Sequence, residues 1–115
     1  MNVATKRSLA ELLPALQAEV LTGTPEATVT GCYISDLLSD VLAHTDSGTL
    51  WVTIQIHRNV LSVAAMKDIA AVLLTCGRRP EPAVLREAAE AGIVLLITPL
   101  SSYEAAGKLW EAGLR

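Results

Sequence analysis

The stretch TLWVTIQIHRNVLSVAAMKDIAAVLLTC, residues 49–76, contains two apolar segments with a helical pattern between them. Residues 49–56 and 70–76 are rich in the β-branched and aliphatic side chains that favour strands, whereas residues 60–68 favour a helix. A strand, a helix and a second strand in this order are typical of a parallel βαβ unit. The stretch therefore predicts a parallel sheet with helices packed on it.

The same alternation continues on both sides of this unit. A first helix is expected after Ser8, and the other expected elements are strands at 19–22, 27–34 and 93–98 and helices at 36–44, 82–92 and 101–113. The segments AVLLT and IVLLI are continuously apolar, as expected for strands that helices cover on both faces. The sequence predicts one α/β domain over residues 1–115. It has three layers, with a mainly parallel sheet of about four to five strands flanked by helices.

The ends of the predicted helices have recognisable signals. Two Ser-x-x-Glu sequences, beginning at Ser8 and Ser101, match the capping box. Pro82 stands where the first turn of a helix tolerates proline, and Gly92 and Gly113 stand where a helix ends in a left-handed residue.

The composition limits the partners. With 51% hydrophobic residues and a mean hydropathy of +0.42, the chain is expected to bury a large sheet or a large subunit interface. A net charge of -3, with only two Trp, two Tyr and no Phe, argues against nucleic acid as a partner. The apolar runs are short and the N-terminal segment has no apolar signal core, so we expect no membrane partner and a cytoplasmic location.

The sequence predicts neither a metal nor a cofactor. Cys32 and Cys76 are too few for an iron-sulfur cluster or a structural zinc, and without a secretion signal we expect reduced, partly buried thiols. Asp36 and Asp40 lie one helical turn apart, but no third ligand follows at a diagnostic spacing. Phosphate-loop, dinucleotide, zinc-protease and serine-hydrolase motifs are absent, so we expect no enzyme. A weaker alternative is a catalytic His57 paired with Cys76 or Asp36.

Polar side chains follow the predicted strands at the point where each one ends. Because the carboxyl ends of parallel strands lie along one edge, ligands usually bind there. Strand alternation would place Gln55 and His57 on one face. The candidate ligand-binding residues at this edge are Ser35, Asp36, Gln55, His57, Asn59, Gly77, Arg78 and Arg79.

The turn after residue 76 is the most suggestive part of this edge. Gly77 permits an unusual backbone angle, and Arg78 and Arg79 beside a helix N-terminus suit a phosphate or carboxylate. A structural role is the alternative, in which these arginines form surface ion pairs with Glu81 or Glu87. Likewise Ser35 or Asp36, and separately Asn59, have the side chains of ordinary helix N-caps.

The segment VTGCYISDLLSDVLAH (residues 29–44), followed by WVTIQIHRN (51–59), resembles the DRTGG domain family. The similarity covers nearly the whole chain, which looks like a stand-alone member. The motif that gives the family its name does not occur verbatim. LLTCGRRP (73–80) is its possible counterpart, with Cys76 in place of a glycine.

The resemblance implies a regulatory role. Such domains accompany CBS domains in some family II pyrophosphatases, precede the transferase in some phosphotransacetylases, and are similar to the N-terminal domain of HPr kinase. Short stand-alone relatives are often labelled as iron-sulfur hydrogenase-associated or as HPr-kinase-like proteins, and these labels imply a partner. The resemblance also implies a homodimer, which the high apolar content fits.

Two hypotheses follow. In the first, the chain is a non-catalytic regulatory module that binds a small anionic metabolite or a nucleotide and modulates a partner enzyme, for example one of phosphate metabolism. In the second, it is an accessory or assembly protein of an iron-sulfur hydrogenase or another redox complex, without a ligand of its own.

Overall fold

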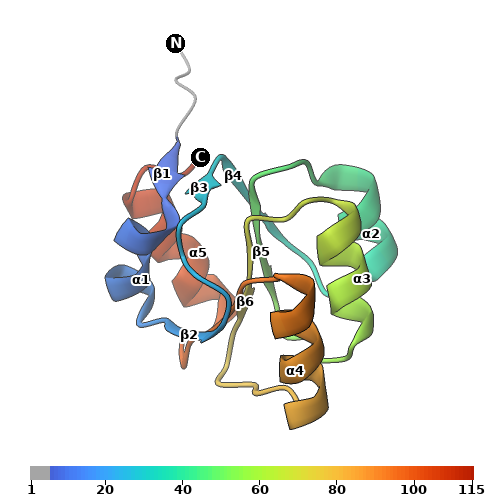
Figure 1. The fold of residues 1–115 in the computed structure, drawn as a ribbon. Helices are drawn as coiled ribbons and strands as arrows, with labels where there is room; N and C mark the ends of the chain where they lie inside the picture. Colours follow the sequence, from blue (N-terminus) through green and yellow to red (C-terminus); the bar gives the residue numbers. More distant parts are fainter. Residues whose placement is uncertain (1–5) are drawn as a thin grey trace.

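A computed structural model describes residues 6–115 of the chain (Figure 1). Its main sheet has five strands in the order β2-β7-β6-β5-β4. β4 to β7 are parallel to one another, and β2 joins β7 in the antiparallel direction. The strands are β2 (Glu19–Thr22), β4 (Gly31–Ile34), β5 (Thr49–Thr53), β6 (Ala71–Leu74) and β7 (Leu95–Ile97). The predicted mainly parallel sheet is confirmed.

Helices cover both faces of this sheet (Figure 1). One face carries α1 (Leu9–Leu16) and α5 (Ser102–Glu111). The other carries α2 (Leu38–His44), α3 (Asn59–Met66) and α4 (Pro82–Ala91). This is the predicted three-layer α/β arrangement. None of the helices between residues 6 and 115 has the length and apolarity needed to span a lipid bilayer.

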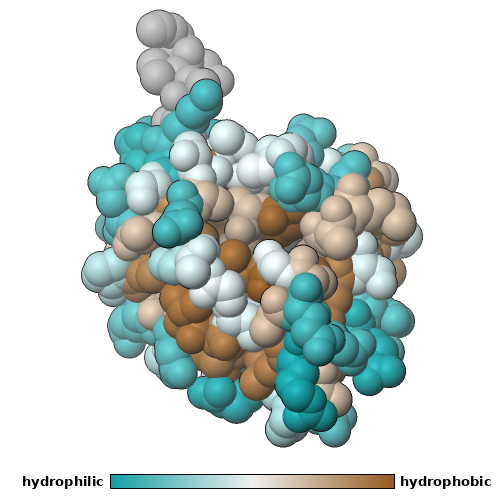
Figure 2. All heavy atoms as spheres, viewed as in Figure 1, coloured by the Kyte–Doolittle hydropathy of each residue, from teal (hydrophilic) through white to brown (hydrophobic). Residues whose placement is uncertain are grey.

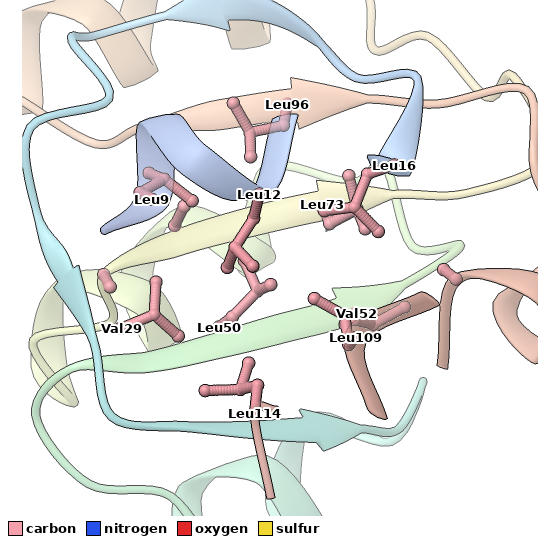
Figure 3. Packing of buried hydrophobic residues seen from close by; sticks show 13 residues of the cluster. Leu9, Leu12, Leu16, Val29, Leu50, Val52, Leu73, Leu96, Leu109 and Leu114 are labelled. Atoms are coloured by element: carbon pink, nitrogen blue, oxygen red, sulfur yellow. The ribbon is translucent and has the colours of Figure 1, made fainter. Parts of the chain in front are cut away.

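The central strands are apolar because both of their faces are covered. Leu50 and Val52 of β5 and Leu73 of β6 pack with leucines of α1 and α5 (Figure 3). Trp51 and Val72 point to the opposite face, which α2, α3 and α4 cover. All five residues of β5 are buried, and its three central residues, Leu50, Trp51 and Val52, are apolar.

The helix-end predictions are correct in part. Ser101 forms the predicted capping box with Glu104, and Gly92 ends α4 in the left-handed conformation with φ 73°. Ser8 is the N-cap of α1, but its side chain makes no capping hydrogen bond. The Ser8 capping box is therefore wrong. The backbone of Ser8 is extended and pairs with Thr28 in a second, two-stranded sheet of β1 (Arg7–Ser8) and β3 (Thr28–Val29).

Two predicted strands are shorter than expected. The segment 27–34 divides at Thr30, whose amide donates to the carbonyl of Gly48 at 2.9 Å. β5 ends at Thr53 because the next two amides leave the sheet ladder: Ile54 donates to the Asp36 carboxylate at 3.0 Å, and Gln55 to the Thr53 hydroxyl at 3.1 Å. At the end of β5, side chains thus replace the backbone partners that would extend the strand.

Some hydrophobic surface stays accessible. On the face seen in Figure 2, it gathers at the centre and lower left, where β2 lies in Figure 1. The β2 residues Val20 and Leu21 are half-buried. The large hydrophobic side chains that are exposed lie elsewhere, at Ile34, Leu37, Met66, Tyr103 and Trp110.

Candidate functional site

Three adjacent strands are each followed or ended by a buried threonine at the carboxyl edge of the sheet. Thr53, Thr75 and Thr98 are fully inaccessible to solvent. Thr53 donates to the Asp36 carboxylate at 2.7 Å, Thr75 shares a 2.9 Å hydrogen bond with the Ser102 hydroxyl, and Thr98 donates to the carbonyl of the last α1 residue. All three hydroxyls form hydrogen bonds within the protein, and these bonds hold in place the turns that border the carboxyl edge of the sheet.

The turn between β4 and α2 is one of those turns. Asp36 accepts from Thr53 and from the Ile54 amide, and Ser35 accepts from the Leu37 amide at 3.2 Å. The N-cap of α2 is Leu37, without a side-chain capping bond, so the interpretation of Ser35 or Asp36 as its cap is wrong. Asp36 stabilises the end of β5 instead.

Asp40 belongs to a separate polar cluster on α2. Its carboxylate accepts from the Tyr33 hydroxyl at 2.9 Å and lies 2.9 Å from His44 Nδ1. Hydrogen bonds from Ser35, Tyr33 and His44 lower the pKa of Asp40. Because α2 begins at Leu38, Asp36 and Asp40 do not share a helix face. Within residues 6–115, no group of His, Cys, Asp and Glu is placed to hold a metal ion.

A cleft of about 510 Å³ opens where the chain leaves β5 and where it enters α4. Three of the predicted site residues line it: Gln55, His57 and Arg78. The remaining lining comes from the same segment and from the first turn of α4, namely Ile56, Arg58, Glu81, Ala83 and Val84. The structure therefore brings together side chains from two successive strand-to-helix connections.

Local hydrogen bonds position the polar lining. Gln55 donates from Nε2 to the Asp36 carbonyl at 3.3 Å, and His57 Nδ1 accepts from the Asn59 amide at 3.2 Å. Arg58 is the N-cap of α3, and its Nη2 lies 3.0 Å from the Glu87 carboxylate. The cleft thus borders the N-termini of α3 and α4, where the helix dipoles favour negative charge.

The other predicted site residues do not line this cleft. Ser35 and Asp36 belong to the β4–α2 turn, and Gly77 to the turn after β6. Asn59 is the first residue of α3, so it is not the predicted N-cap, and it lines a neighbouring groove of about 530 Å³ between α3 and α4. Arg79 lies 3.6 Å from Glu19. The alternative, in which the turn arginines pair with Glu81 or Glu87, differs from the structure, where Arg79 lies near Glu19 and Glu87 pairs with Arg58.

A tight turn after β6 precedes the two arginines. Cys76 and Gly77 both have left-handed backbones, with φ 60° and 64°, and the Arg78 amide donates to the Thr75 carbonyl at 3.3 Å. Two consecutive positive φ angles characterise a tight turn that favours glycine, and a residue with a Cβ is strained there. Cys76 therefore occupies a position that suits glycine, and Arg78 leaves the turn toward the cleft.

Sequence reasoning missed Arg58 and Glu81. The predicted strand was extended through residue 56, and its alternation selected Gln55 and His57 but not Arg58. Because β5 ends at Thr53, the following residues form a turn in which neighbouring side chains face one cleft. The available signal was their position near the start of two predicted helices: Glu81 directly precedes the helix at 82–92, and Arg58 lies two residues before the helix at 60–68.

The two cysteines differ in environment. Both are free thiols; Cys32 is half-buried, whereas Cys76 is exposed and not partly buried as predicted. Burial raises the pKa of Cys32 to about 12. Since the thiolate is the nucleophile, we expect iodoacetamide at about pH 8 to modify Cys76 at least tenfold faster than Cys32, measured by intact mass. Cys76→Ser should remove the fast phase. Equal rates at both thiols would contradict the burial of Cys32.

Comparison with known proteins identifies the fold. Residues 11–112 match the DRTGG domain family. None of the curated proteins compared matches the chain. Among solved structures, the chain is similar to the CBS and DRTGG domains of the regulatory region of Clostridium perfringens pyrophosphatase, complexed with its activator diadenosine tetraphosphate. The TM-score is 0.73 at 16% identity, over 89% of this chain and 45% of that chain. The chain belongs to the DRTGG domain family.

Proposed function

We propose that the chain is a non-catalytic, ligand-sensing regulatory domain. It binds a small anionic metabolite or a nucleotide in the cleft lined by Gln55, His57, Arg58 and Arg78. The observation that carries this proposal is a cleft that borders two helix N-termini and is lined by Arg58 and Arg78. The similarity to a pyrophosphatase regulatory region complexed with a dinucleotide activator supports a regulatory role.

Arg58 is accessible to such a ligand. Its ion pair with Glu87 joins side chains that are 58% and 42% exposed. An exposed pair of this kind contributes about 0–1 kcal/mol, whereas a hydrogen bond to a charged group contributes roughly 1.5–3 kcal/mol. We therefore expect a phosphate group in the cleft to compete with Glu87 for the Arg58 guanidinium. Glu81, the one carboxylate of the lining, opposes anions and favours ligands that keep their charge near the arginines.

The contacts of His57 support binding over catalysis. Its Nδ1 accepts from the Asn59 amide, and Asp36 is already bonded to Thr53 and Ile54. Cys76 is exposed on the neighbouring turn and does not line the cleft. Among the described residues that line the cleft, none is a serine, threonine or cysteine that would serve as a nucleophile beside His57.

The proposed test is a thermal-shift titration of the wild-type chain with inorganic pyrophosphate, AMP and ATP. Ligand at about 100 times its dissociation constant should stabilise the fold by roughly 2.7 kcal/mol and raise the Tm by roughly 10 °C. Sodium chloride at matched ionic strength controls for general salt effects. If every anion leaves the Tm unchanged at millimolar concentration, the proposed function is wrong.

We further propose that the domain acts as a homodimer on a partner enzyme. The alternative function is an accessory or assembly role in an iron-sulfur hydrogenase or another redox complex, without a ligand. The exposed Tyr103 and Trp110 favour some protein contact, because large aromatic side chains are enriched at interfaces. A flat ligand titration together with a stable complex on mixing with a purified hydrogenase would favour this alternative.

A further inference from the structure

Arg58 lines both the anion cleft and the neighbouring groove of about 530 Å³ between α3 and α4. Its Nη2 lies 3.0 Å from the carboxylate of Glu87, which lines the groove but not the cleft. Because Arg58 is the N-cap of α3 and Glu87 belongs to α4, this ion pair joins the two helices that form the groove. One guanidinium group thus faces two demands, from a ligand in the cleft and from a carboxylate in the groove.

The groove combines apolar and acidic side chains. Its apolar lining comes from Leu61, Ala65, Ala91 and Ile93. Its two carboxylates are Glu87 and Glu90, and Arg58 is the one cation among the described residues that line it. Arg86, also on α4, does not line the groove. The lining therefore has a net negative charge, which is largest when Arg58 turns away from Glu87.

We propose that the Arg58–Glu87 ion pair is a switch between the cleft and the groove, and that the groove docks a partner helix with lysine or arginine beside its apolar face. An anion in the cleft draws the Arg58 guanidinium away from Glu87. The groove then presents two carboxylates without a neighbouring cation, so the cationic helix binds more tightly. This inference rests on the proposed anion site and adds the route by which its occupancy reaches a partner.

The ion pair is weak enough to act as a switch. Both of its side chains are exposed, and an exposed pair of this kind shifts an equilibrium by about fivefold or less. The arrangements in which Arg58 contacts Glu87 or a bound anion therefore differ little in free energy, and the charge of the ligand decides between them. The coupling between cleft and groove is limited to the same size.

Charge and shape together select the class of partner. An apolar surface between two helices accepts the apolar face of a third helix, and the carboxylates of Glu87 and Glu90 favour cations on that helix. Met66 extends the apolar surface, because it follows the groove residue Ser62 by four positions, on the same side of α3, and is 71% exposed. A cationic amphipathic helix meets both requirements.

Calorimetric titration with pyrophosphate tests the switch from the side of the cleft. Glu87→Gln releases Arg58 and should raise the affinity about two- to fivefold. Glu90→Gln removes the same charge from the same groove without breaking the pair, and should change the affinity less than about 1.5-fold. In an Arg58→Gln background, Glu87→Gln should have no effect, because the group for which it competes is gone.

These titrations separate two kinds of failure. If wild-type protein binds pyrophosphate and Glu87→Gln binds it no more tightly than Glu90→Gln does, the switch is wrong and the anion site stands. If the wild-type chain binds no pyrophosphate, both the switch and the proposed anion site are overturned.

A cationic peptide tests the switch from the side of the groove without any anion. The probe is a fluorescent helix of about 14 residues with leucine on one face and lysine on the other, and anisotropy measures its binding. Arg58→Gln leaves Glu87 unpaired and should raise the peptide affinity about two- to fivefold. Arg79→Gln, which frees Glu19 outside the groove, should change it less than about 1.5-fold. Equal effects of the two arginine substitutions would overturn the inference.

Two further variants locate the docking surface and its coupling. Glu90→Gln should weaken peptide binding about twofold or more, whereas Glu11→Gln on α1, on the opposite face of the sheet, should not. Saturating pyrophosphate should raise the peptide affinity of the wild-type chain but not of Glu87→Gln, since coupling between two sites is reciprocal. Peptide binding that depends on Glu11 as much as on Glu90, or a gain that persists in full in Glu87→Gln, would overturn the inference.

Discussion

Trp51→Ala is expected to lower the free energy of unfolding by about 3–5 kcal/mol, measured by urea denaturation. The side chain is fully buried and packs among Val41, Val60 and Val72 between the sheet and α2 and α3. Truncation would leave a large cavity in a core whose other members are aliphatic and cannot close it. A decrease of about 3–5 kcal/mol is a large part of the total free energy of unfolding of an ordinary domain.

Trp51→Phe separates packing from hydrogen bonding. The Trp51 Nε1 donates to the Ser35 carbonyl at 2.8 Å, which anchors the turn that positions Asp36. The phenylalanine variant keeps most of the apolar contact but loses this bond, so we expect a loss of roughly 1–2 kcal/mol. Trp110→Ala, at an exposed site, is the matched control and should change stability by less than about 1 kcal/mol. Equal effects of Trp51→Ala and Trp110→Ala would contradict the described core.

Arg78→Ala is expected to weaken pyrophosphate binding tenfold or more, measured by isothermal titration calorimetry. A hydrogen bond between charged groups contributes roughly 1.5–3 kcal/mol, and about 1.4 kcal/mol corresponds to a tenfold change in affinity. Arg78 lines the cleft, whereas its neighbour Arg79 lies 3.6 Å from Glu19. Arg79→Ala removes the same charge one residue away and should change the affinity less than about threefold.

The pair of variants separates a specific site from general electrostatics. If both substitutions weaken binding equally, the chain responds to net charge and the cleft is not the site. If Arg79→Ala alone weakens binding, the assignment of the cleft is wrong. Both residues are exposed on the turn after β6, so neither substitution is expected to unfold the chain.

Much of the fold follows from local sequence. The apolar runs at β6 and β7 predict strands covered on both faces, and Pro82, Gly92 and Ser101 mark helix ends that the structure confirms. Each of these features depends on residues that are three or four positions apart in the chain, so the sequence alone is enough to predict it. The lateral order of the strands and the antiparallel β2 depend on contacts between distant segments.

Two boundary errors occur where a side chain accepts from a backbone amide. β5 stops at Thr53 because Asp36, on another turn, captures the Ile54 amide. α3 begins at Asn59, one residue earlier than predicted, and the His57 ring nitrogen accepts the Asn59 amide hydrogen at this boundary. In each case a side chain offers a partner that the local pattern does not show, so residue preferences alone placed the boundary wrongly.

The sequence predicts where the candidate site lies better than it predicts which residues line it. The carboxyl edge of the parallel sheet is where the cleft lies, and Gln55, His57 and Arg78 line it. Arg58 also lines the cleft, because β5 ends at Thr53 and the residues after it form a turn that the predicted strand alternation does not include. Arg78 and Arg79 are adjacent and equivalent in sequence, but Arg78 lines the cleft whereas Arg79 lies 3.6 Å from Glu19.

The most direct measurement is a two-dimensional amide NMR titration of the wild-type chain with inorganic pyrophosphate. The account predicts saturable shifts at Gln55, His57, Arg58 and Arg78 and at the first turn of α4. Amides of α5, on the opposite face of the sheet, should stay unchanged. No saturable shift at millimolar pyrophosphate, or shifts confined to residues outside the cleft, would contradict the assignment of this cleft as an anion-binding regulatory site.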